Sequence, residues 1–174
     1  MNPTWLIRTG RTVMRPVAYQ DLADLQRIKT DPRVFAVMLG GVRTPVRVQE
    51  ELAEDIITWG SRGFGWWTVR ARDTGAFHGL TGLAERQDGR GIALRLAFWP
   101  EAQGHGLARE AGGAALRFGH DRAGLLRIIA VAREANIASR IVLGGIGMVV
   151  AGHFRQDGHD MLLFESKTHG CHRA

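Results

Sequence analysis

The sequence has very few cysteine, lysine and tyrosine residues. Its one cysteine, Cys171, leaves no partner for an intramolecular disulfide bond, and such cysteine usage favours a reducing compartment such as the cytoplasm. No apolar run approaches the roughly 18 to 20 residues that span a bilayer. The first residues also lack the hydrophobic region of a signal peptide. We therefore expect a cytoplasmic protein with no membrane-spanning segment.

The charge is positive, with a formal net value of +6, and almost all basic residues are arginines because Lys29 and Lys167 are the only lysines. A net positive field concentrates anions such as nucleic acids, acidic proteins or the phosphates of a coenzyme. The arginines are spread along the chain, however, and no arginine-rich tract is interleaved with aromatic residues. This distribution disfavours nucleic acid as the partner.

Histidines gather near the C-terminus together with the cysteine. None of these residues forms a pair with the spacing of a zinc motif, so we predict no metal site. The group consists of His153, His159, His169, Cys171 and His172.

A length of 174 residues predicts one domain over residues 1–174, with a loose lead at 1–10 and a flexible tail at 166–174. Hydrophobic periodicity predicts a strand, then helices, then three strands of an antiparallel meander, then helix, strand, helix and two strands. The resulting fold class is α+β, with a central mixed and mostly antiparallel sheet. The expected strands are 12–17, 64–71, 77–83, 92–98, 126–131, 148–154 and 161–165, and the expected helices are 21–30, 33–39, 44–59, 107–121 and 136–143.

The other expected elements support one glycine-bearing loop, which leads directly into the helix expected at 107–121. Gly104 and Gly106 allow the backbone to approach a bulky ligand. Apolar residues then recur at the offsets of a helix packed on a core, at Leu107, Ala111, Ala114, Ala115 and Phe118. Because the first amides of a helix have no partner within it and carry partial positive charge, such a loop suits phosphate oxygens.

A dinucleotide-binding loop is the alternative interpretation of these glycines. That loop needs a third glycine where this chain has Arg109, and it usually opens a domain. Glu134, at the end of the next expected strand, could imitate the acid that binds a ribose. The alternative is therefore weakened but stays open.

A wider frame of motifs surrounds the loop: Pro100-Glu101, Gln103-x-x-Gly106-x-Ala108, Glu110-Ala111, Asn136-x-x-Ser139 and Gly147-Met148. This frame resembles the GNAT superfamily of acyl-CoA N-acyltransferases, closest to the branch of ribosomal-protein alanine and serine N-acetyltransferases, and the resemblance covers roughly residues 11–166. It implies a GNAT-like domain in which two central strands splay apart. It also implies that the co-substrate acetyl-CoA lies in the gap between those strands, with a backbone amide of the splayed strand facing the thioester oxygen.

The resemblance also assigns residues to the coenzyme. The pyrophosphate would bind the loop at Gln103, Gly104, His105, Gly106, Leu107, Ala108 and Arg109, and the pantetheine arm would lie along Ala97, Phe98 and Trp99. The Asn136 position would contact the coenzyme, and Ser139 would donate a hydrogen bond to the departing thiolate. From the residues alone, Asn136 is equally a helix cap and Ser139 a packing residue.

The sequence departs from the family at the acid and base positions. Leu143 stands where many members have a tyrosine, and Ala93 and Arg95 stand where a glutamate is frequent on the meander strand. Glu85 and Glu101 remain as bases, and we assign Glu85 to the catalytic set with Ser139. A base acting through water, or no dedicated base, is equally compatible.

These observations predict an N-acetyltransferase that moves an acetyl group from acetyl-CoA to a primary amine by direct transfer in a ternary complex. The acceptor would be a protein N-terminus or a small amine, and assembly as a homodimer is compatible with the sequence. Two alternatives remain open: a non-catalytic coenzyme-binding module of the same fold, and a basic RNA-binding adaptor.

Overall fold

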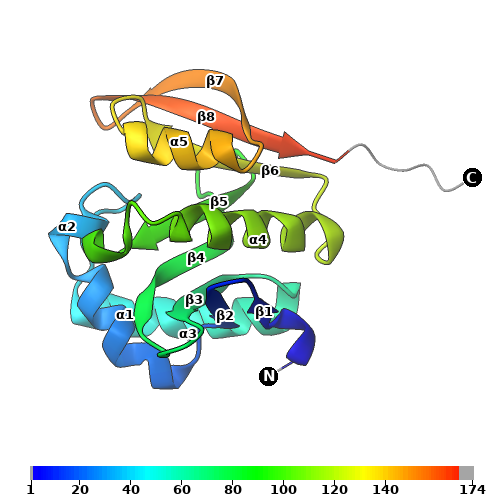
Figure 1. Cartoon of the computed structure of the whole chain (residues 1–174). Helices are drawn as coiled ribbons and strands as arrows, with labels where there is room; N and C mark the ends of the chain where they lie inside the picture. Colours follow the sequence, from blue (N-terminus) through cyan, green and yellow to red (C-terminus); the bar gives the residue numbers. More distant parts are fainter. Residues whose placement is uncertain (1, 169–174) are drawn as a thin grey trace, which may run out of the picture.

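The computed structural model of the protein describes residues 2–168, which form one eight-stranded sheet with the strand order β1-β2-β3-β4-β5-β6-β8-β7. All neighbouring strands are antiparallel except β5 and β6, which are parallel. This mixed sheet with helices agrees with the predicted α+β class (Figure 1). The strands are β1 (Ile7–Arg8), β2 (Thr12–Pro16), β3 (Trp66–Ala71), β4 (Phe77–Glu85), β5 (Ile92–Phe98), β6 (Arg127–Arg133), β7 (Val149–Gln156) and β8 (His159–Lys167).

Five α-helices accompany the sheet, and local signals fix several of their ends. Thr44 accepts a hydrogen bond from the Arg47 amide at the start of α3, where Pro45 is the first helical residue, and Gly63 ends that helix with a left-handed φ of 72°. The helices are α1 (Leu22–Lys29), α2 (Pro32–Phe35), α3 (Pro45–Arg62), α4 (Leu107–Asp121) and α5 (Ile137–Gly145). No helix among the described residues is long and apolar enough to cross a membrane.

The apolar residues form two cores on opposite faces of the sheet. Helix α4 packs on one face, where Trp67 and Phe118 meet edge to face with ring centroids 5.1 Å apart. Helices α1, α2 and the first half of α3 cover the other face around Trp66 and Leu80. Because side chains alternate along a strand, each residue of β5 and β6 faces either α4 or the α1–α3 layer.

Strands β5 and β6 separate along most of their length. They share a single register pair, Ala93 with Ile129, whereas β4 pairs with β5 from Gly79 to Glu85. Beyond Ala93 the two halves of the sheet diverge, with β6, β8, β7 and α5 on one side of the gap (Figure 1). The predicted splay of the central strands is therefore present.

The N-terminal residues differ from the expected loose lead. Residues 3–5 form a short 3-10 helix, and β1 pairs with β2. The Trp67 indole donates to the Trp5 carbonyl at 2.9 Å, and the Trp5 and Trp59 rings lie 5.1 Å apart. Packing of the half-buried Trp5 ring on Trp59, together with the hydrogen bond from Trp67, holds this segment in place.

The C-terminal tail begins later than expected, because Ser166 and Lys167 belong to β8 and pair with β6. Residues 169–174, which include His169, Cys171 and His172, lie outside the described residues. Within the described part of the chain, no group of three or more His, Cys, Asp and Glu side chains could hold a metal ion.

Two helices also differ from their predicted form. The helix expected at 33–39 is only the short α2, and a turn follows it. The helix expected at 44–59 is α3, which continues to Arg62 and buries Val48, Leu52 and Trp59. At the turn between Leu52 and Trp59, Ile56 is 41% exposed and the side chain of Asp55 faces the interior instead.

Candidate active site

The loop before α4 presents backbone amides with no acceptor in the protein. Gly104 and Gly106 both have left-handed φ angles, 78° and 76°, and a side chain at Gly104 would meet no atom within 4 Å. Within the described residues, none of the amides from Gly104 to Arg109 donates to a protein acceptor, and Gly106 caps α4 without a side chain. This open row of donors at a helix N-terminus suits an anion.

An arginine from the N-terminal hairpin fixes the loop. Arg11 donates from Nη1 to the His105 carbonyl at 2.7 Å, and its Nε bonds to Glu110 at 2.7 Å. Glu110 also accepts from the Arg11 amide at 2.8 Å and from the Thr9 hydroxyl at 2.5 Å. The first turn of α4 and the loop are therefore tied to the turn between β1 and β2.

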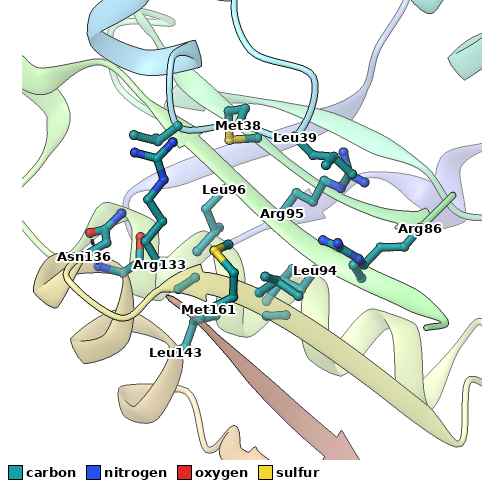
Figure 2. Close-up of a pocket in the computed structure, with 16 residues that line it drawn as sticks. Met38, Leu39, Arg86, Leu94, Arg95, Leu96, Arg133, Asn136, Leu143 and Met161 are labelled. Atoms are coloured by element: carbon teal, nitrogen blue, oxygen red, sulfur yellow. Dashed lines mark hydrogen bonds between the residues drawn. The ribbon is translucent and has the colours of Figure 1, made fainter. Parts of the chain in front are cut away.

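A cavity of about 100 Å³ lies where β5 and β6 diverge (Figure 2). Its floor is formed by the two strands, and the segment that follows α2 contributes the opposite wall through Met38 and Leu39. The described residues that line it include Asn136 and Ser139 from the start of α5, together with Leu94, Arg95, Leu96, Ala130, Ala132, Arg133, Leu143 and Met161.

The register of the meander determines which β5 amides face this gap. Leu83 donates its amide to Gly65, on the β3 side, and Leu83 pairs with Leu94. The backbone N–H and C=O groups of Leu94 therefore point away from β4. Because every second residue of a strand directs these groups to the same side, those of Leu96 and Phe98 also point away from β4. The Phe98 carbonyl, on that side, accepts from Gln103 Nε2 at 3.0 Å. The amides of Leu96 and Phe98 thus face the space between the strands.

Asn136 performs the capping role that its residue type allows. Its Oδ1 accepts from the Ser139 amide at 3.1 Å and so caps α5, while both residues also line the cavity. Leu143 is buried at 4% exposure in the position where a tyrosine is frequent. No hydroxyl stands there to supply a proton.

A larger cavity of about 710 Å³ adjoins the first on the side of α1–α3. Its lining includes Asp55 of α3, and burial raises the pKa of this carboxyl to about 6, against the lowering effect of Lys29. Lys29 lies 3.9 Å from Asp55 and binds Glu51 at 2.8 Å. Glu85 lies at the rim, 60% exposed, with its carboxylate 2.7 Å from Arg62.

Arginines dominate the junction of the two cavities. Arg86 is held by Asp88 at 2.6 Å and by Gln156 at 3.0 Å. Arg95 of β5 and Arg133 of β6 extend toward the segment of Met38 and Leu39 (Figure 2). Burial, followed by the charges of Arg86 and Arg43, lowers the pKa of Arg95 from its ordinary value.

Comparison with known proteins agrees with this arrangement. The Acetyltransferase (GNAT) domain family matches residues 11–149 of the sequence. The chain belongs to the GNAT acetyltransferase family. The predicted superfamily and the predicted N-acetyltransferase activity are thus confirmed.

Solved structures show the same GNAT fold at low sequence identity. An acetyltransferase from Agrobacterium tumefaciens is 22% identical with a TM-score of 0.80, covering 94% of each chain. A ribosomal-protein-S5-alanine acetyltransferase from Vibrio fischeri is 16% identical with a TM-score of 0.76, covering 93% of this chain and 96% of that one. A spermidine N-acetyltransferase from Vibrio cholerae in complex with CoA and spermine is 19% identical with a TM-score of 0.76, covering 91% and 96%.

In this GNAT protein the predicted site residues fall into two groups. Asn136 and Ser139 line the cavity, and Gln103, the first residue of the loop 103–109, bonds to the Phe98 carbonyl on the side of β5 that faces the gap. Ala97 pairs with Leu80 of β4 and is buried in the core under α1–α3. Trp99 follows β5, and its amide donates to His78 at 3.0 Å. Glu85 lies apart from them, at the rim of the larger cavity. The roles of these residues stay predictions.

Sequence reasoning missed Asp55 and Arg133 and gave Arg95 no role. A signal existed for Asp55, because it follows Val48 and Leu52 on the apolar stripe of α3. For Arg133 the signal was weaker: it is one charged residue at the end of an otherwise apolar strand, and only the splay turns it toward a cavity.

Proposed function

We propose that the protein transfers the acetyl group of acetyl-CoA to a primary amine directly, within a ternary complex. Acetyl-CoA supplies the acyl group in activated form, as a thioester. The single observation that carries the proposal is the combination of unbonded amides from Gly104 to Arg109 with an open gap between β5 and β6.

The residues of the loop fit a diphosphate. Left-handed glycines at 104 and 106 keep side chains away from the amides, and the N-terminus of α4 adds partial positive charge. Residues 103, 105 and 107–109 complete the loop as part of the proposed coenzyme site. Arg11 stabilises it through the His105 carbonyl.

The gap fits an extended arm. The amides of Leu96 and Phe98 face it in the manner of an unpaired strand edge, so a chain of amides can pair there. An amide at this edge also suits the carbonyl oxygen of the thioester, where negative charge develops as the amine attacks. Ala97, Phe98 and Trp99 form the proposed wall for the arm, with Asn136 across the gap.

The reaction needs a neutral amine and a proton for the leaving thiolate. The amine nitrogen forms the new N–C bond, the C–S bond breaks, and the proton lost by the amine balances the proton taken up by the thiolate. Ser139, at the cavity wall, is the proposed hydrogen-bond donor to the sulfur. Glu85 is the proposed base, reached through water because Arg62 already holds its carboxylate.

Two measurements test this function. Saturating acetyl-CoA, at about 100 times its Kd, is expected to stabilise the protein by about 2.7 kcal/mol and so to raise its Tm. Free thiol release with amines is expected to show intersecting double-reciprocal lines, because both substrates bind before any product leaves. Parallel lines with an acetylated enzyme would contradict direct transfer, and binding without turnover across a broad amine panel would favour a non-catalytic module.

A further inference from the structure

The cavity between β5 and β6 carries an excess of positive charge. Three guanidinium groups line it, those of Arg86, Arg95 and Arg133, and no described carboxylate does. All three lie on the face of the sheet covered by α1–α3, because their positions alternate with the residues of β4, β5 and β6 that pack under α4.

Two of these three arginines lack a partner. Arg86 is bound by Asp88 and Gln156. In contrast, the guanidinium groups of Arg95 and Arg133 make no hydrogen bond or ion pair with any residue between 2 and 168, although both side chains are half-buried. No buried side-chain nitrogen or oxygen atom among the described residues lacks a hydrogen-bond partner, so the unpaired nitrogens of these two groups are accessible from the cavity. A partly desolvated cation of this kind gains from an anionic ligand.

The acids of the facing helix are occupied elsewhere. Glu51 of α3 binds Lys29 at 2.8 Å and Arg43 at 2.7 Å. Glu54 lies 3.3 Å from Arg47, and Asp55 lies 3.9 Å from Lys29. None of these carboxylates comes within 4.0 Å of Arg95, and Glu51 and Asp55 act on its charge only at longer range, so no described carboxylate pairs with it directly.

The coenzyme does not supply the missing anionic partner of Arg95. Its proposed diphosphate site is the loop at the N-terminus of α4, on the opposite face of the sheet, and an acetyl thioester carries no charge. An anion that approaches Arg95 must therefore enter from the larger cavity between the sheet and α3, on the side from which an acceptor amine would come.

From this geometry we infer that the acceptor is a small primary amine that also carries a carboxylate, as an amino acid does. Arg95 binds the carboxylate, and Arg133, which lines the β6 side of the same cavity, adds positive charge there. A guanidinium fork matches the two oxygens of a carboxylate, and such charge-assisted bonds are about twice as strong as neutral ones. The inference rests on the proposed function and specifies its substrate class.

The same geometry disfavours cationic acceptors. A polyamine would bring further positive charge toward Arg95 and Arg133 and would leave both unpaired. An uncharged amine would also leave them unpaired, and a site built around a partly desolvated charge discriminates against ligands that fail to pair it.

The experiment compares matched amines in the thiol-release assay. Several amino acids of different side chain are each assayed beside their carboxamide and their decarboxylated amine, with spermidine and a short uncharged peptide in the same panel. We expect the free amino acids of at least one set to have a kcat/KM that exceeds those of its amide and its amine by about 10 to 100-fold.

Variants assign the preference to Arg95. The substitution Arg95→Gln should raise KM for the carboxylated acceptor by about 10 to 100-fold, and Arg95→Lys should recover part of the loss. The change should be small for the amide and the decarboxylated amine. Arg155→Gln on β7, which removes the same charge from a side chain that is 75% exposed, is the matched control and should behave as the unchanged protein.

The outcomes separate the two proposals. Equal use of acid, amide and amine, or a preference for spermidine or the peptide, would overturn the inference while leaving acetyl transfer intact. A uniform fall in kcat for all acceptors in Arg95→Gln would assign Arg95 to the reacting carbonyl and would also overturn it. Failure to bind acetyl-CoA or to release thiol with any amine would instead overturn the proposed function itself.

Discussion

Arg11 and Glu110 lie 99 positions apart in the sequence, and Glu110 accepts two hydrogen bonds from Arg11, one from the amide at 2.8 Å and one from Nε at 2.7 Å. Through its Nη1, Arg11 also bonds to the His105 carbonyl in the loop before α4. The pair therefore couples the N-terminal hairpin to the proposed diphosphate site.

Removing the charge of Glu110 should lower stability. Although burial raises it, hydrogen bonds from Thr9 and Arg11 hold the pKa of Glu110 below its ordinary value, so this stabilisation is present at neutral pH and is lost as pH falls through the lowered pKa. Because Arg11 is 54% exposed, we expect Glu110→Gln to cost only about 1 kcal/mol in urea unfolding. Glu101→Gln, at a side chain that is 71% exposed, is the control, and equal effects in both would contradict the coupling.

Substitution of Gly106 should abolish coenzyme binding. Gly106→Ala places a methyl group in the loop, 3.4 Å from Arg11 Nη2, at a residue with φ of 76°. Gly124→Ala introduces similar backbone strain at φ of 67°, with no atom within 4 Å and far from the loop. Both should lose about 1 to 2 kcal/mol of stability, but only Gly106→Ala should lose the rise in Tm with acetyl-CoA. Retention of that rise would place the diphosphate elsewhere.

Loss of the Ser139 hydroxyl should affect the chemical step. If Ser139 donates to the departing sulfur, Ser139→Ala removes one hydrogen bond and should lower kcat about 10-fold, with KM little changed. Ser61→Ala on α3, where the hydroxyl bonds to the Ile57 carbonyl in an exposed position, serves as the control. An unchanged kcat at saturating substrate would leave Ser139 with a packing role only.

Glu85→Gln should lower the rate more at low pH than at high pH. A base is needed most when the amine is protonated, so the deficit should shrink toward pH 9, where neutral amine is abundant. The measurement is the pH profile of kcat/KM, and Asp160→Asn on β8, at a side chain that is 68% exposed, is the control. A deficit that is the same at every pH would argue against a role in proton transfer.

Asp55 should make stability depend on pH in the opposite sense to Glu110. Its pKa is raised from 3.8 to about 6, so between these values the native state holds a proton that the unfolded chain has lost. Stability therefore falls as pH rises through this window, by on the order of 3 kcal/mol in total. The difference in unfolding free energy between the unchanged protein and Asp55→Asn, measured from pH 4 to 7, should show this slope. Parallel curves would mean that Lys29 and Arg95 offset the effects of burial, Glu51 and Glu54 and hold the pKa of Asp55 near its ordinary value.

The sequence was sufficient to predict the helices and strands that neighbouring residues specify. The glycines of the loop and the stripe of α4 predicted a helix that begins at residue 107, and Ala111, Ala115 and Phe118 are buried as expected. The meander was predicted because turn residues and a period of two mark each strand. The gap between β5 and β6 came from the family resemblance, since no local feature of either strand specifies it.

The parts that were missed depend on contacts between distant residues. Trp5 is held by Trp59 and Trp67, and periodicity near the N-terminus carries no trace of those partners. The inward position of Asp55 in place of Ile56 in α3 is set by packing on the sheet and by Lys29. The sequence shows an arginine at position 95, where a glutamate is frequent in the family. That its guanidinium group has no partner can be seen only when the positions of α3 and β6 are known.

The single register pair between Ala93 and Ile129 also bears on the mechanics of the sheet. Away from that pair the two halves are joined by side chains: Arg127 bonds to the Arg90 carbonyl at 2.9 Å, and His120 bonds to Ser166 at 2.9 Å. A ligand that pairs with the edges of both strands would act as a ninth strand and add main-chain hydrogen bonds where the sheet has none, so substrate binding would stiffen the junction of the two halves and not only the residues it touches.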